Sequence, residues 1–174
     1  VDVGFNHEQL LLFELNAMAN GSSPGQALGV YERTVARLAG VPGVHRVGYS
    51  QVPLLTGGSW FMGVTVHGYV PTTRESVCVN AVDPGFFATI ELPPLLGRNI
   101  TARDEAAAPK VIVVNQAFVR KYFPTENANA IGRRIGFGGP TSTPDLEIVG
   151  VVRDAQYYIV KGPPPPTVYL PFAQ

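Results

Sequence analysis

The sequence contains a single cysteine, Cys78, among its 174 residues. One cysteine cannot form an intrachain disulfide, and a chain of this length buries enough apolar surface to fold without covalent cross-links. The neighbours Val77 and Val79 are apolar and offer no charge that would stabilise a thiolate. We therefore expect Cys78 to pack as a small apolar side chain and not to act as a nucleophile.

Charged residues are also scarce. They make up 15% of the chain, and 13 Lys and Arg balance 13 Asp and Glu. A protein that binds nucleic acid through its phosphates needs a basic surface, so this composition excludes nucleic acid as a partner. Hydrophobic residues reach 45%, which excludes an intrinsically disordered chain and predicts a folded one.

Long hydrophobic runs are missing as well. The longest runs, residues 10–13 and 111–114, have the length of strands, whereas a membrane helix needs about 18 or more apolar residues. The chain begins at Val1 without an initiator methionine or the apolar core of a signal peptide. We therefore expect it to be a piece of a longer protein.

Known catalytic and metal-binding patterns do not occur in the sequence. The three histidines have no metal-ligand spacing, there is no GxSxG motif, and the glycines between positions 132 and 139 match no phosphate-binding loop. We therefore predict no catalytic residue, no metal ligand and no cofactor. Two acidic pairs leave open a hydrolase that uses an unrecognised pair of carboxylates: Asp104 with Glu105, and Asp145 with Glu147.

The N-terminal part of the sequence predicts a strand, a helix and a second strand. Residues 10–15 form an apolar run, which predicts a largely buried strand. Ser23 is the expected N-cap and Gln26 completes a capping box for a helix that ends at Gly40. The segment through residues 47–49 then predicts the second strand.

The remainder of the sequence predicts mostly strands with two short helices. Asp83 and Pro84 begin a helical turn, and Asn115 caps a helix over residues 116–123. Strands are predicted for residues 64–70, 77–82, 111–114, 133–137, 146–152 and 167–170, the fifth of them buried on both faces. Because strands and helices do not alternate regularly, we predict an α+β fold.

Six segments together form a pattern that extends over most of the chain. They are residues 80–90 (NAVDPGFFATI), 94–98 (PLLGR), 111–118 (VIVVNQAF), 131–135 (IGRRI), 147–154 (EIVGVVRD) and 168–172 (VYLPF). In this order and spacing they resemble the MacB-like periplasmic core domain of ABC transporter permeases, within the FtsX-like permease superfamily.

The resemblance implies a two-lobed architecture and a location. Residues 1–89 together with 167–174 would form a porter-like α/β lobe, and residues 90–166 an inserted, smaller mixed α/β lobe. The domain would lie between the first two membrane helices of a four-helix permease, on the periplasmic or extracytoplasmic face of the bacterial inner membrane. The implied partners are the membrane-spanning remainder of the permease, a second permease copy and a periplasmic adaptor.

Three functions follow from these observations as hypotheses. The first is a non-catalytic domain of an export-type transporter that relays conformational change and docks partners or substrate. The second is a small-molecule or lipid-binding module, for which Trp60, Phe61 and Met62 would form an exposed apolar contact. The third is the hydrolase with an unrecognised carboxylate pair.

Overall fold

The structure is a computed structural model that describes residues 3–19, 21, 23–54, 58–69, 76–124, 130–138, 142–156 and 162–174. The helices and strands follow one another as α1 (Pro24–Ala39), β1 (Phe61–Val66), β2 (Ser76–Val82), α2 (Phe86–Thr89), β3 (Pro94–Gly97), β4 (Val111–Asn115), α3 (Gln116–Tyr122), β5 (Arg134–Phe137), β6 (Leu146–Val152) and β7 (Thr167–Pro171). Among the described residues, α1, α2 and α3 all fall short of the length or apolarity that crossing a bilayer requires.

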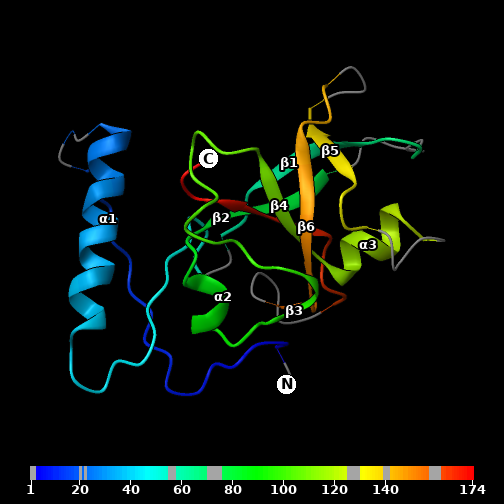
Figure 1. The fold of residues 1–174 in the computed structure, drawn as a ribbon. Helices are drawn as coiled ribbons and strands as arrows, with labels where there is room; N and C mark the ends of the chain where they lie inside the picture. The colour runs from blue at the N-terminus through cyan, green and yellow to red at the C-terminus, as the bar shows by residue number, and fades with distance from the viewer. Residues whose placement is uncertain are drawn as a thin grey trace.

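The sheet closes on itself because β6 pairs with neighbours along both of its edges. The strand order is β3-β6-β4-β7-β2-β1-β5, and β5 pairs in turn with β6. One edge of β6 contacts β4, while the other contacts β5 at residues 146–147 and β3 at residues 150–152. The strands β6, β4, β7, β2, β1 and β5 therefore form a ring, with β3 as an added strand on β6 (Figure 1).

The last strand, β7, joins the early and late parts of the chain. It runs parallel to β2, with Cys78 opposite Thr167, and antiparallel to β4, with Val113 opposite Tyr169. Strands from residues 1–89 and from residues 90–166 thus belong to one continuous sheet. The lobe boundaries that the resemblance implies stay a prediction.

Both faces of the sheet are buried, each under its own apolar cluster. Along β4, Ile112 and Val114 point into one cluster together with residues of α3, whereas Val113 points into the other together with residues of α2. This is why the run at residues 111–114 is apolar without alternation. The helices α2 and α3 are short, and each contributes side chains to one of the two apolar clusters.

Most of the predicted elements are confirmed. Helix α1 begins at the predicted capping box, in which Gln26 N donates to Ser23 Oγ at 3.4 Å and Ser23 N donates to Gln26 Oε1 at 2.8 Å. It has Gly40 as its C-cap. Five predicted strands match β2, β4, β5, β6 and β7, and the sixth corresponds to β1, which begins earlier than predicted and ends at Val66. The loop expected at residues 72–75 lies outside the described residues.

The prediction of a buried strand at residues 10–15 is wrong. The segment belongs to neither helix nor strand, and its side chains are largely exposed to solvent. An apolar run becomes a strand only where another strand accepts its backbone hydrogen bonds. The ring is closed between β5 and β6, and it leaves this segment outside.

The second strand predicted for the N-terminal part is also wrong, since residues 47–49 form no strand and a single isolated bridge joins Ser50 to Val82. The Asp83 carboxylate accepts the N–H of Tyr49 at 2.8 Å, in the position that a backbone carbonyl would take in a ladder. A side chain has replaced the backbone acceptor, so the pairing stops after one bridge.

Asn115 connects β4, α3 and β7 through three hydrogen bonds. Its Oδ1 accepts from Phe118 N at 3.0 Å and from Thr167 N at 2.9 Å, and its Nδ2 donates to the carbonyl of Pro165 at 2.9 Å. The side chain is almost completely buried. Each of its polar atoms therefore satisfies a backbone group that water cannot reach.

We expect Asn115→Ala to lower the free energy of unfolding by about 2 to 4 kcal/mol, because it leaves buried backbone groups without partners. Urea denaturation followed by circular dichroism measures the loss. Asn16→Ala is the matched control, since the Asn16 side chain is exposed and accepts from Met18 N, and it should cost less than about 0.5 kcal/mol. Equal losses in the two variants would contradict this role of Asn115.

Candidate functional site

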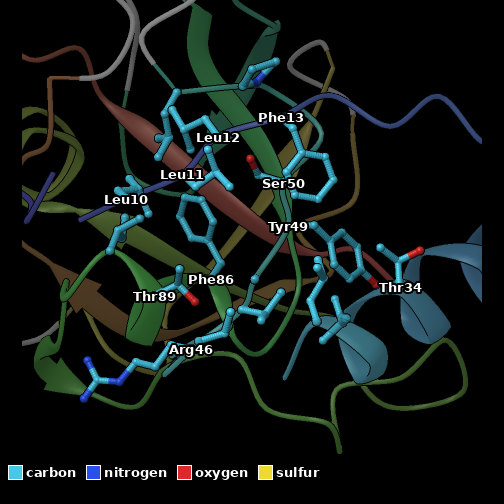
Figure 2. A pocket seen from close by; sticks show the side chains of 18 of the residues that line it. Leu10, Leu11, Leu12, Phe13, Thr34, Arg46, Tyr49, Ser50, Phe86 and Thr89 are labelled. Atoms are coloured by element: carbon cyan, nitrogen blue, oxygen red, sulfur yellow. The ribbon is translucent and has the colours of Figure 1, made fainter. Parts of the chain in front are cut away.

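A groove of about 1510 Å³ lies between the N-terminal segment, α1 and the segment that follows α1. Residues 8–16 form one wall, Thr34 and neighbouring residues of α1 form another, and residues 43–51 form a third. Phe86 and Thr89 of α2 also line it, and Figure 2 shows both side chains below the N-terminal segment. The groove is a cleft beside the ring and not a cavity inside it.

The N-terminal wall of the groove exposes an unusual amount of apolar surface. Leu11 is 84% exposed and Phe13 is 62% exposed. Leu12 and Leu15 of the same wall are also exposed. A contiguous apolar surface of this kind marks a contact site more often than a surface of scattered apolar residues does.

Helix α1 is attached to the ring through three aromatic side chains. The ring centroids of Tyr31 and Tyr49 are 5.6 Å apart, those of Tyr31 and Phe172 are 5.7 Å apart, and those of Tyr49 and Phe172 are 4.9 Å apart. These separations are typical of favourable tilted and edge-to-face pairs. Figure 1 shows α1 standing at one side of the molecule, away from the other helices.

The Tyr49 hydroxyl and the Asp83 carboxylate lie in surroundings that disfavour their charged forms. Burial, reinforced by the negative charges of Asp83 and Glu32, raises the pKa of Tyr49 to about 12. Burial also raises the pKa of Asp83, although hydrogen bonds from the backbone of Tyr49 and Gly85 oppose this shift. The Asp83 carboxylate, which accepts the Tyr49 N–H, fixes the segment after α1 against the end of β2.

The buried Asn80 fixes the same segment at a second point. Its Oδ1 accepts from Val52 N at 2.9 Å and its Nδ2 donates to Val52 O at 3.2 Å. The amide thereby satisfies the backbone of Val52 in both directions, as a neighbouring strand would. Asn80 and Asp83 together hold in place the wall formed by residues 43–51. Neither of the two side chains lines the groove itself.

Three of the four carboxylates considered for a hydrolase lie in separate ion pairs. Asp145 pairs with Lys110 at 2.7 Å and Glu147 pairs with Arg134 at 3.2 Å. Asp104 bonds to Arg98, while its neighbour Glu105 is exposed. Structural ion pairs have this arrangement, whereas an acid–base pair has two carboxylates aimed at one reacting atom.

A smaller pocket of about 320 Å³ is lined by both Asp83 and Asp104. The Asp83 oxygens accept backbone N–H groups, and the Asp104 oxygens accept from Arg98 and Thr101. Their acceptor positions are therefore used within the fold. In the described part of the chain, no group of three or more His, Cys, Asp or Glu side chains is placed to hold a metal ion.

The three residues predicted as an apolar contact point in different directions. Trp60 and Met62 are half-buried and pack against the apolar cluster under α3. Phe61 lies between them on β1 and is 53% exposed. Alternation along a strand thus leaves Phe61 as the side chain of the three that faces solvent most. None of the three lines the groove, so the contact proposed for them is a separate surface.

Sequence reasoning missed the groove because it placed residues 10–15 in a strand of the core. Tyr31, Val35 and Leu38 form an apolar stripe along one face of α1, and the sequence shows this stripe by its spacing. In the structure these side chains are only half-buried, so the stripe could have indicated the groove. A stripe of this width predicts a packing partner. Whether that partner is present in the folded chain depends on contacts between distant segments.

Asp104 holds the turn after β3. Arg98 donates to its two oxygens at 2.7 and 2.8 Å, and Thr101 N donates at 2.7 Å. Burial by itself would raise the pKa of Asp104, but the hydrogen bonds from Arg98 and Thr101 outweigh burial and lower it below its ordinary value of 3.8. The charged carboxylate is therefore the form that the folded state stabilises.

We expect Asp104→Asn to lower the free energy of unfolding at pH 7 by about 2 kcal/mol, because it weakens charge-assisted hydrogen bonds. A lowered pKa contributes stability above the unfolded value of 3.8, and that contribution is lost as the pH falls through the folded pKa. The difference from the unsubstituted chain should therefore shrink below about pH 4, as urea denaturation at pH 7, 5 and 3 would measure.

Asp145→Asn is the control for the Asp104 prediction. The hydrogen bond from Lys110 lowers the pKa of Asp145 too, but this pair is exposed on both sides. An exposed pair contributes less than about 1 kcal/mol. A loss for Asp104→Asn that stays constant from pH 7 to pH 3 would contradict the assigned ion pair.

A family profile described as the MacB-like periplasmic core domain matches residues 12–174. No curated protein matches the chain. The family profile therefore covers the ring, all three helices and the three walls of the groove, apart from the first residues of the N-terminal wall.

Solved structures with the same fold come from transporter domains. The extracellular domain of the noncanonic ABC-type transporter YknZ from Gram-positive bacteria has a TM-score of 0.53 and 19% identity, over 81% of this chain and 62% of that one. The periplasmic region of MacB from Actinobacillus actinomycetemcomitans has a TM-score of 0.54 and 17% identity, over 82% and 55%. A domain of a putative permease protein from Porphyromonas gingivalis has a TM-score of 0.52 and 14% identity, over 79% and 54%.

These identities show a shared fold and nothing more specific. The aligned part of this chain covers between 54% and 62% of the three solved domains, so each of them has a large portion with no counterpart here.

Proposed function

The chain belongs to the family of MacB-like periplasmic core domains of ABC transporter permeases, and from this membership we propose that it is a non-catalytic relay of an export-type permease. In this function the domain transmits conformational change outside the membrane and docks partners or substrate there. The membrane-spanning remainder of the permease, a second permease copy and a periplasmic adaptor are its proposed partners.

The observation that carries the relay proposal is the closed ring of strands. Every strand of the ring has a partner on both sides, so no edge can peel away without breaking a ladder. Both faces of the ring are packed with apolar side chains. A close-packed core of this kind resists deformation. A body of this kind moves as one unit when it is pushed, as a relay requires.

The ion pairs support a non-catalytic role. Asp104, Asp145 and Glu147 each have a cationic partner, and Asp154 has one as well, in Arg120 at 2.5 Å. Asp154 also accepts from Ala117 N at the start of α3, at 2.7 Å. Asp104 stabilises a turn, Asp154 the start of α3, and Glu147 the pairing of β6 with β5, all of which are structural tasks.

Distance measurements between spin labels in the full-length permease test the relay. Arg103 and Arg153 are exposed, and the buried Cys78 will not react, so cysteines at positions 103 and 153 carry the labels. We expect ATP to leave the distance between positions 103 and 153 of one copy unchanged. The distance between the two copies of position 153 should change by several ångströms.

Two controls make the relay measurement decisive. A nucleotide-binding subunit that cannot bind ATP should abolish the change between copies. A change within one copy would contradict a rigid relay, and no change in either distance would contradict a relay of any kind.

The groove favours a second candidate function, a small-molecule or lipid-binding module. It is large enough for an apolar ligand of drug size, and its exposed leucines and phenylalanine would supply the contacts. Phe61 offers a separate apolar contact on β1. This candidate differs from the relay because it requires measurable affinity of the isolated domain for an apolar ligand.

Fluorescence of Trp60, the single tryptophan of the chain, reports a contact at β1. If this surface binds lipid, phosphatidylglycerol vesicles should change its emission, and Phe61→Asp should weaken the response at least tenfold. Leu95→Asp is the control, since Leu95 is similarly exposed on β3, a strand that does not pair with β1. A flat response from the unsubstituted domain contradicts a lipid contact at Phe61.

A further inference from the structure

Residues 3–6, which we call the N-terminal anchor, are attached to the core, unlike residues 10–15. Gln156 N donates to the carbonyl of Val3 at 2.8 Å. Phe5 is 6% exposed and packs in the apolar cluster that also contains residues of α2. Figure 1 shows this end of the chain below β3 and the lower end of β6. The chain is therefore fixed to the body of the domain before it continues into the exposed segment.

Asn6 attaches the anchor to the end of α2. Its N–H donates to the carbonyl of Ile90 at 3.0 Å, and its Nδ2 donates to Glu91 Oε2 at 3.0 Å. The other carboxylate oxygen of Glu91 pairs with Arg46 at 3.4 Å. The anchor is thus bonded at one end to the backbone that follows β6 and at the other end to the backbone that follows α2.

Position 4 requires glycine because the anchor touches the backbone that follows β6. Gly4 has a φ of 80°, and a Cβ atom there would lie 2.2 Å from the carbonyl oxygen of Asp154. Since the atom that it would meet belongs to the backbone, no side chain could turn away to relieve the contact. A side chain at position 4 would therefore push the anchor off the core.

The residues that hold the anchor are bonded to the ring at short range. Residues 154–156 directly follow β6, the strand that pairs along both of its edges. The Asp154 carboxylate accepts from Ala117 N at 2.7 Å and pairs with Arg120, so it also holds the start of α3. A displacement of the anchor therefore acts on β6 and α3 within a few residues.

The next attachment of the chain to the ring through its backbone lies beyond α1. Tyr49 N donates to the Asp83 carboxylate, and Val52 N donates to the Asn80 side chain. Between the two attachments lie the exposed apolar segment and α1, in which Ala27 is the one buried residue. Both ends of this part of the chain are fixed to the ring. A force that arrives at the anchor therefore reaches the ring without passing through α1.

We propose that the N-terminal anchor is the point at which movement of the membrane-spanning part of the permease enters the domain. This inference rests on the proposed relay and assigns its connection to residues 3–6. The load passes from the anchor to residues 154–156 and from there to β6. Helix α1 and the exposed segment before it lie outside this path.

Spin labels in the full-length permease test this role of the anchor. With labels attached to Arg103→Cys in both copies, ATP should change the distance between the copies by several ångströms. Gly4→Ala should reduce this change by about half or more, because the anchor no longer contacts residues 154–156.

Gly68→Ala is the matched control for Gly4→Ala. Gly68 has a φ of 84°, so alanine meets the same backbone strain at both positions. A Cβ atom at position 68 would have nothing within 4 Å, so no contact is lost there. This variant should leave the ATP-dependent change unaltered.

A second variant breaks the anchor from the side of the ring. Gln156→Pro removes the N–H that Val3 accepts, because proline has no backbone donor. It leaves residues 3–6 unchanged and should reduce the ATP-dependent change as Gly4→Ala does.

Amide hydrogen exchange of the 174-residue chain, resolved by NMR, shows whether these variants keep the ring folded. In the unsubstituted chain, the Asn6 and Gln156 amides should exchange at least tenfold more slowly than in an unstructured peptide. Gly4→Ala should remove this protection and leave that of the β4 amides in place.

The outcomes distinguish the anchor from the relay. An ATP-dependent change that survives Gly4→Ala and Gln156→Pro would overturn the anchor and leave the relay standing. An equal loss in Gly68→Ala would also overturn the anchor, as would unprotected Asn6 and Gln156 amides in the unsubstituted chain. Loss of β4 protection in both anchor variants would assign residues 3–6 to folding and not to transmission. No change with ATP in the unsubstituted permease would contradict the relay, and the anchor with it.

Discussion

Pairing of β6 on both of its edges is the constraint on which the rest of the structure depends. Because β5 and β3 share one edge of β6 while β4 occupies the other, the sheet closes and keeps its backbone groups satisfied. The central strand β4 is buried on both of its faces, which explains the uninterrupted apolar run at residues 111–114. Helices α2 and α3 need only be short, since each covers part of a sheet that already holds together.

Closure has a consequence for the N-terminal part of the chain. With its ladder complete, the ring has no edge for residues 10–15, and α1 is attached through aromatic contacts of Tyr31 with Tyr49 and Phe172. The groove is the space left between these parts. The groove is thus bounded by the N-terminal segment and α1, which lie outside the ring.

Where a strand lacks a neighbouring strand, buried polar side chains form hydrogen bonds with its backbone instead. Asn80 satisfies both backbone groups of Val52, Asp83 accepts the N–H of Tyr49, and Asn115 joins three elements. Each is a directional contact that fixes one arrangement, whereas apolar packing tolerates several. Among the described residues, Glu91, Asp104, Asp145, Glu147 and Asp154 each form an ion pair with a nearby cation. Asn80, Asp83 and Asn115 therefore have structural tasks in this fold.

Local patterns in the sequence determined the helix caps, the buried strands and the family. Ser23 with Gln26 and Asn115 with Phe118 act within three residues, so their hydrogen bonds can be predicted without knowing the fold. Only the tertiary structure decided that residues 10–15 remain unpaired, that Phe61 and not Trp60 faces solvent, and which cation neutralises each carboxylate. Strand pairing and burial are properties of two segments distant in sequence, and an apolar run carries no information about whether its partner is free.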